Sequence, residues 1–221
     1  MTLSPAPMRS RRQKIKDFLT FPLRALILFH DDRWGLSSLA SERFDYVASE
    51  VQGYCLDIGC GYSNRFVREY LGGHGVGIDV YPYAGLTEEN LVPDLTHLPF
   101  ADHSFDTVTF IANLNHAPES QRDAELAEAF RVLRPGGRII VTMGLPWVEI
   151  LVHKLVWFYD RFLGINVDMD SERGMQEGES YFLTEDEICL RLTRAGFQHI
   201  VRKPFWTQWG LNRMYLARKP P

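Results

Sequence analysis

The sequence predicts a doubly wound α/β fold, in which a mostly parallel sheet carries helices on both faces. From residue 54 onward, strand-like apolar runs alternate with stretches of helical periodicity, and this alternation is typical of a parallel sheet. The run LDIGCGYS at residues 56–63 passes from an apolar strand into a turn with two alternating glycines, as expected where a buried strand ends beside a ligand. A second run, GVGIDV at residues 75–80, ends near an acid, and this spacing suits a carboxylate that binds a ribose.

Residues 1–50 are predicted to form an extension made of a basic tail and helices. Residues 1–16 hold five basic side chains and no acid. Apolar residues then follow at helical spacing over residues 15–29, and we expect Pro22 to kink this helix or to begin its second half. The basic leader and the apolar helix suggest peripheral membrane contact through residues 9–29. The alternative is a helix that covers the cleft or packs on the body of the protein.

Residues 51–221 are predicted to form one domain with an insert on the substrate side at residues 145–183. Periodicity and turn signals predict strands at residues 54–59, 75–80, 91–94, 104–113 and 138–143. Helices are predicted at residues 39–51, 64–71 and 121–133, and another begins at Thr184, where Glu187 is spaced for a capping box. Strands at residues 197–205 and 212–219 predict an antiparallel hairpin that closes the sheet. The apolar run of residues 147–163 predicts a helix within the insert.

Composition and charge exclude several classes of protein. With 221 residues, of which 45% are hydrophobic and 24% charged, the chain is an ordinary globular protein able to bury a full core. The formal net charge of −4 argues against nucleic-acid binding. Three cysteines without metal-ligand spacing indicate reduced thiols and a cytoplasmic protein. Asp168 and Asp170 lack a convincing third ligand, so no metal is expected.

Four segments, taken in order, resemble the class I S-adenosylmethionine-dependent methyltransferases, and most closely the group of ubiquinone and menaquinone C-methyltransferases. These segments are residues 56–63, 75–80, 94–108 and 132–142. The nearest alternative is a Rossmann dehydrogenase. That class requires a third glycine at the position of Asn64, and it accounts neither for Asp57 nor for the closing hairpin.

The resemblance implies a Rossmann-like methyltransferase sheet and a role for each residue around the first two strands. Gly59 and Gly61 would lie under the methionine part of S-adenosylmethionine, and Asp57 would orient the turn and help to hold the ammonium group. Asp79 would accept hydrogen bonds from both ribose hydroxyls. Ser63 occupies a position where a third glycine is common, which is tolerable if its backbone angles are ordinary.

Further along the chain, the resemblance implies that Asp94 and Leu95 frame the adenine and that Asn113 offers its backbone carbonyl. His116 follows the strand at residues 104–113, whose carboxyl end borders the cleft. A histidine there is a candidate base that removes a proton from the methyl acceptor. The alternative is a loop histidine that is bonded to backbone.

The resemblance therefore implies a methyltransferase that acts on a small, apolar acceptor such as a quinone precursor, a lipid or a secondary metabolite. The large apolar residues of the insert are expected to line the acceptor pocket, and the alternative is a helix that packs in the core. His153 is expected on a solvated helix edge, and the alternative is a place in the lining of the pocket. The alternative is a non-catalytic protein that binds S-adenosylmethionine and works as a partner or a sensor. Such a protein would keep the glycine turn and both acids but would have a blocked acceptor cavity.

Overall fold

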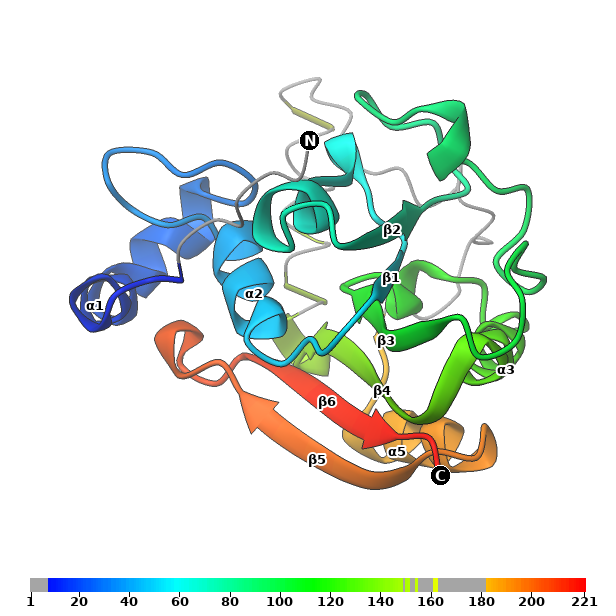
Figure 1. Cartoon of the computed structure of the whole chain (residues 1–221). Helices are drawn as coiled ribbons and strands as arrows, with labels where there is room; N and C mark the ends of the chain where they lie inside the picture. The colour runs from blue at the N-terminus through cyan, green and yellow to red at the C-terminus, as the bar shows by residue number, and fades with distance from the viewer. Residues whose placement is uncertain (1–7, 149, 152–153, 155–160, 163–181) are drawn as a thin grey trace.

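A six-stranded sheet forms the centre of the part of the chain that the computed structural model describes, residues 8–148, 150–151, 154, 161–162 and 182–221. Its order is β2-β1-β3-β4-β6-β5 (Figure 1). The strands are β1 (Cys55–Ile58), β2 (Gly75–Ile78), β3 (Phe105–Ile111), β4 (Leu133–Gly144), β5 (Gln198–Pro204) and β6 (Asn212–Arg218). β2, β1, β3 and β4 pair in parallel, whereas β6 pairs antiparallel with both β4 and β5. The mostly parallel sheet and its antiparallel C-terminal hairpin are confirmed.

Two hydrophobic clusters cover opposite faces of the sheet. The larger one joins the strands to α3 (Arg122–Val132) and α5 (Glu185–Arg194). The other joins the opposite faces of the strands to α2 (Leu39–Ala48) and the π-helical turn η2 (Phe66–Tyr70). Neighbouring residues of β4 illustrate the alternation, since Ile139 and Val141 belong to the first cluster and Ile140 to the second. Both faces are therefore covered, as a parallel sheet requires.

The strand order reverses between β1 and β3. The chain proceeds from β1 outward to β2 and then returns to β3 on the other side of β1. Connections that leave in opposite directions open a crevice at the carboxyl ends of the two strands, and this is where doubly wound folds bind ligands. Asp57 of β1 lies in register with Gly77 of β2 and Thr109 of β3, so the switch point is centred on this acid.

Two elements differ from the prediction. Residues 91–94 do not form a strand and contribute a single parallel bridge between Asp79 and Leu91, because Pro93 cannot donate to a ladder. The helix expected over residues 64–71 is replaced by a 3-10 turn, η1 (Tyr62–Asn64), and by η2. Ser63 has φ of 57°, so the condition of an ordinary backbone angle, under which a serine is tolerable at this glycine position, is not met. This left-handed residue prevents a regular helix from beginning directly after the glycine turn.

The predicted capping box of α5 is confirmed. Thr184 Oγ1 accepts from the Glu187 amide at 3.3 Å, and the Glu187 carboxylate accepts from the Thr184 amide at 2.7 Å. Most of the insert at residues 145–183 lies outside the described residues, including His153, Asp168 and Asp170.

The N-terminal helix α1 (Arg11–Ile27) contains Pro22 within one helical span rather than ending or restarting there. A proline at this position has no N–H for the carbonyl four residues earlier, that of Phe18. The indole Nε1 of Trp209, in the connection between β5 and β6, donates to this carbonyl at 3.0 Å. A distant side chain thus replaces the hydrogen bond that the proline removes.

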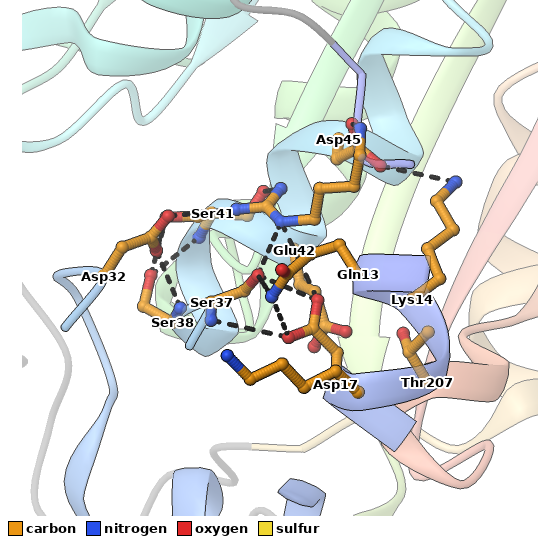
Figure 2. Close-up of polar contacts among 12 residues, drawn as sticks. Gln13, Lys14, Asp17, Asp32, Ser37, Ser38, Ser41, Glu42, Asp45 and Thr207 are labelled. Carbon is orange, nitrogen blue, oxygen red and sulfur yellow. Dashed lines mark hydrogen bonds and ion pairs between the residues drawn. The ribbon is translucent and has the colours of Figure 1, made fainter. Parts of the chain in front are cut away.

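A buried ion pair holds α1 against α2 and the C-terminal hairpin. Arg24 is fully buried and pairs with Glu42 of α2 at 3.0 Å. The same guanidinium donates to the carbonyls of Asp17 and Ser37 at 2.6 and 2.8 Å. Gln208, before β6, donates to the Glu42 carboxylate at 2.8 Å. Figure 2 shows Glu42 and Asp17 within the polar layer between α1 and α2.

Arg24→Ala should lower the free energy of unfolding by about 3–5 kcal/mol, because it leaves the Glu42 carboxylate buried without its cation. Urea unfolding followed by circular dichroism measures the change. Arg33→Ala is the matched control, since Arg33 is 63% exposed and lies 4.0 Å from the exposed Asp31. Its loss should cost less than about 1 kcal/mol. Equal effects of the two substitutions would contradict the anchoring role of Arg24.

Candidate functional site

The turn after β1 requires glycine at position 59 for internal packing. Gly59 has φ of 76°, and a Cβ added there would overlap the side chain of Asn113. The amides of Gly59 and Cys60 both donate to the carbonyl of Ile78, at 2.8 and 3.0 Å. The turn is thereby fixed to the end of β2 on one side and to Asn113, beyond β3, on the other.

Gly61 differs from Gly59 because the space beside it is open. Its φ of 59° and ψ of −157° lie in a region that is essentially restricted to glycine. A Cβ added at this position would have no heavy atom within 4 Å. The turn therefore presents bare backbone to an unfilled space at the switch point, which is the arrangement needed for close approach of a ligand.

The carboxylate of Asp79 connects the glycine turn to β2. Its Oδ2 accepts from the Gly61 amide at 3.0 Å, and its Oδ1 accepts from the Tyr81 amide at 3.1 Å. The residue is fully buried. Because each carboxylate oxygen has two lone-pair sites, each retains one acceptor site beyond these backbone bonds.

Asp57 is a second buried acid in the same place. It is 1% exposed, and its Oδ1 accepts from Thr109 Oγ1 at 2.6 Å. Burial raises its pKa to about 7, the Thr109 hydroxyl opposes this rise, and the negative charge of Asp79 adds to it. A carboxyl with this pKa changes charge near neutral pH, so a cationic ligand beside it would favour its ionised form.

Asp94 and Leu95 lie in the segment that follows the Asp79 bridge. The Asp94 carboxylate accepts from the Thr96 hydroxyl and amide, each at 2.7 Å, and contacts His97 Nδ1 at 2.9 Å. These hydrogen bonds, led by that of the Thr96 hydroxyl, lower the pKa of Asp94 to about 2. Leu95 is 5% exposed and belongs to the larger core cluster, so its side chain packs in the core.

Asn113 and His116 follow the carboxyl end of β3. Asn113 is 2% exposed and packs against Gly59, so it belongs to the same site as the glycine turn. Its backbone carbonyl accepts from the His116 amide at 2.8 Å, within the 3-10 turn η4 (Leu114–His116). His116 is half-buried. The structure thus brings Asp57, Gly59, Gly61, Asp79 and Asn113 together. Asp94 and Leu95 lie in the segment that follows the Asp79 bridge, and His116 ends the turn η4.

Four residues around this site were not predicted from the sequence. Thr109 holds Asp57, and it could have been noticed as a polar residue inside the apolar run of β3. Tyr62, Tyr81 and Tyr83 form a chain of ring contacts beside the glycine turn, with centroids 4.7 and 4.8 Å apart. The signal for the last two was the YPY run directly after Asp79 and Val80.

The sequence of this chain is similar to those of known methyltransferases. Residues 56–141 match a family model described as a methyltransferase domain. A ubiquinone/menaquinone biosynthesis C-methyltransferase from Paracoccus denitrificans is 37% identical over 120 residues, which cover 48% of this chain and 44% of that protein. An arsenite methyltransferase from Halobacterium salinarum is 28% identical over 219 residues, covering 78% of this chain and 52% of that protein. The chain spans about half the length of these curated relatives.

Solved structures share the fold. A methyltransferase from Thermotoga maritima has a TM-score of 0.59 at 14% identity, and the match covers 93% of this chain and 96% of that one. A 1,6-didemethyltoxoflavin-N1-methyltransferase from Burkholderia thailandensis, solved with its acceptor and S-adenosylhomocysteine bound, has a TM-score of 0.54 at 17% identity. That match covers 99% of this chain and 94% of that one.

The raised pKa of Asp57 should make the stability of the protein depend on pH. In the unfolded chain Asp57 ionises near its ordinary pKa of 3.8, whereas in the folded protein it keeps its proton up to about pH 7. Its contribution to stability is thus fully present below about pH 4 and is lost as the pH rises toward 7. The loss reaches up to roughly 4 kcal/mol.

Asp57→Asn cannot ionise, so the unfolding free energy of this variant minus that of the wild type should grow between these two pH values. Urea unfolding at several pH values measures the difference, in which the titration of acids that do not interact with Asp57 cancels. A difference that stays constant with pH would contradict the assigned environment of Asp57.

Proposed function

Since the chain belongs to the class I S-adenosylmethionine-dependent methyltransferases, we propose that it transfers a methyl group from S-adenosylmethionine to a small, apolar acceptor. The observation that carries this proposal is the open backbone of Gly61, whose amide donates to the buried carboxylate of Asp79, at the switch point of a doubly wound sheet. The acceptor would be a quinone precursor, a lipid or a secondary metabolite.

The residues at the switch point fit the chemical groups of the cofactor. Gly61 leaves space for the methionine part to approach the backbone. Asp79 retains acceptor sites for ribose hydroxyls in addition to its two backbone bonds. Asp57 would be ionised by the positive ammonium group of the cofactor, which would compensate the cost of a buried negative charge. Gly59 would act through the shape of the turn.

The adenine end of the cofactor would lie toward Asp94, Leu95 and Asn113. The lowered pKa of Asp94 keeps this carboxylate ionised and able to accept from an exocyclic amine. Since the side chains of Leu95 and Asn113 are buried, their backbone groups would make the contacts with the ring.

When bound, S-adenosylmethionine supplies a methyl group on a positively charged sulfur, which leaves as the neutral sulfur of S-adenosylhomocysteine. The chain has to hold the acceptor in line with this methyl group, and such orientation lowers a barrier by up to roughly 7–11 kcal/mol. In our proposal His116 takes the proton of an acceptor that carries one, as the acceptor lone pair forms its bond to carbon. Residues 51–221 would contain this machinery, with the insert at residues 145–183 lining the acceptor pocket.

Gly61→Ala should weaken the binding of S-adenosylhomocysteine at least about tenfold, because a methyl group would project into the cofactor space. Isothermal titration calorimetry measures the affinity. Gly73→Ala is the matched control, since Gly73 also has positive φ and no heavy atom within 4 Å of an added Cβ. Gly73 precedes β2, at the opposite end of the sheet from Gly61, so its substitution strains the backbone without touching the site. Equal affinities of the two variants for S-adenosylhomocysteine would contradict the proposed contact between Gly61 and the cofactor.

Methyl transfer itself is tested with isotope-labelled S-adenosylmethionine and cell extracts that are separated into organic and aqueous fractions. We expect label in a product of the organic fraction. His116→Ala should lower the rate of labelling by roughly 10²-fold while the affinity for S-adenosylhomocysteine stays unchanged. His74→Ala is the control, because His74 is exposed and lies at the amino ends of the strands.

The outcomes of this experiment separate the alternatives. Label in an aqueous product would contradict the apolar acceptor. Tight binding of S-adenosylhomocysteine without transfer in any fraction would favour a non-catalytic partner or sensor protein. An unchanged rate of labelling in His116→Ala would contradict a role of His116 as the base. The enzyme would then work by orienting the acceptor alone.

A further inference from the structure

The helix α1 packs against the body with its polar side and turns its apolar side outward. Its buried residues are Asp17, Phe21 and Arg24, two of which are charged. Its exposed apolar residues lie on one face, with exposed fractions from 39% to 70%; they are Ile15, Phe18, Leu19, Leu23, Leu26 and Ile27. A surface helix normally shows the reverse arrangement. This orientation therefore requires an explanation beyond the folding of the domain.

Polar contacts hold the side of α1 that faces the body of the protein. The Asp17 carboxylate accepts from the Ser37 hydroxyl at 2.8 Å and from Gln13 Nε2 at 2.9 Å. Lys14 lies 3.4 Å from the Asp45 carboxylate of α2. Figure 2 shows these side chains meeting between α1, α2 and the loop that joins them. Together with the buried Arg24–Glu42 pair, they fix the rotation of the helix, so the outward position of its apolar residues is built into the fold.

Two tryptophans from the other end of the chain extend the apolar side of α1. Trp206 and Trp209 lie with their ring centroids 5.8 and 6.2 Å from that of Phe18, and they are 43% and 51% exposed. We refer to the six exposed apolar residues of α1 and these two tryptophans as the α1 face. A contiguous exposed apolar surface of this kind marks an interaction site.

Positive charge surrounds the amino-terminal end of the α1 face. Arg11, Arg12 and Lys16 are exposed, and the only acid of α1, Asp17, is buried beneath the helix. The exposed surface of α1 thus carries cations and no anion. A second copy of this chain would bring the same cations and no acid on α1 to pair with them, whereas an anionic lipid surface offers the complementary charge.

We propose that the α1 face docks the protein on the surface of a membrane that contains anionic lipids. The helix would lie in the plane of the interface, with its apolar residues among the acyl chains and its arginines at the phosphates. Tryptophan is enriched at this depth of a bilayer because its ring is apolar and its indole N–H is polar. This applies to Trp206, whereas Trp209 contributes its ring only, since its indole N–H donates to the Phe18 carbonyl. Among the described residues, no helix is long and apolar enough to cross a membrane. This proposal does not depend on the reaction that the protein catalyses.

Vesicle flotation tests the proposal. The full-length protein is mixed with vesicles of phosphatidylcholine alone or with added phosphatidylglycerol, at low and high salt. We expect flotation with the anionic vesicles and a marked loss of flotation at high salt. The double substitution Leu19→Glu with Leu23→Glu should lower partitioning at least about tenfold, because it places two charges in the apolar contact. Leu190→Glu on α5 is the matched control, since this leucine is 49% exposed outside the α1 face.

Two further measurements make the result decisive. S-adenosylhomocysteine affinity and circular dichroism of the double variant should equal those of the wild type, which shows that the fold and the proposed cofactor site are intact. The membrane proposal fails if the wild type does not float, or if the double variant floats as well as Leu190→Glu. It also fails if analytical ultracentrifugation shows a wild-type dimer that the double substitution converts to a monomer, since the α1 face would then be an interface between copies.

Discussion

The hydrogen bond from the Gly61 amide to the Asp79 carboxylate ties together the ends of two neighbouring parallel strands. The amides of Gly59 and Cys60 reinforce it by donating to Ile78, the residue before the acid. The shape of the turn after β1 is therefore set by β2 and not by the turn residues alone. The remaining features of the candidate site follow from this constraint. It keeps Gly61 in a conformation that exposes its backbone, and it keeps Asp79 close enough to raise the pKa of Asp57.

The arrangement of this site lowers the stability of the folded protein. Two carboxylates are buried near each other, and the described contacts of Asp57 include a hydroxyl but no cation. Ser63 and Asn64 both have positive φ directly after the glycine turn, and each non-glycine residue in this conformation costs about 1–2 kcal/mol. Buried like charges and backbone strain gather where a protein binds a ligand. A bound cation next to Asp57 would relieve the electrostatic part of this cost, so ligand binding and stability are coupled here through one carboxyl group.

The sequence predicted the features that depend on local patterns. The apolar runs predicted the strands, and the alternating glycines predicted the turn after β1. The Thr184–Glu187 spacing predicted the cap of α5. The misses arise from non-local or unusual backbone conformations. Residues 91–94 look like a strand, but Pro93 limits them to a bridge. The periodicity after Asn64 looks helical, and left-handed Ser63 breaks it. Thr109 was missed because its role depends on registration with β1.

The orientation of α1 shows most clearly what periodicity leaves undecided. The spacing of its apolar residues correctly predicted a helix, and the general rule would turn those residues inward. The opposite outcome depends on Arg24, whose partners come from α2, from the loop that joins it to α1, and from the C-terminal hairpin. None of these partners can be identified from the local sequence of the helix. The place of Pro22 within the helix also depends on a distant residue. The indole of Trp209, which binds the carbonyl that Pro22 leaves without a donor, is 187 residues away.

The contacts of the extension also reach the candidate site. Arg65 follows the glycine turn, and its guanidinium donates to the carbonyl of His30 at 2.7 Å and to the Ser41 hydroxyl at 3.2 Å. His30 in turn lies against Tyr62, with ring centroids 6.4 Å apart. The loop between α1 and α2 thus touches both sides of the strained residues Ser63 and Asn64. An α1 face seated on a membrane would hold this loop in place from outside, and the turn that presents Gly61 would be positioned from β2 on one side and from the extension on the other.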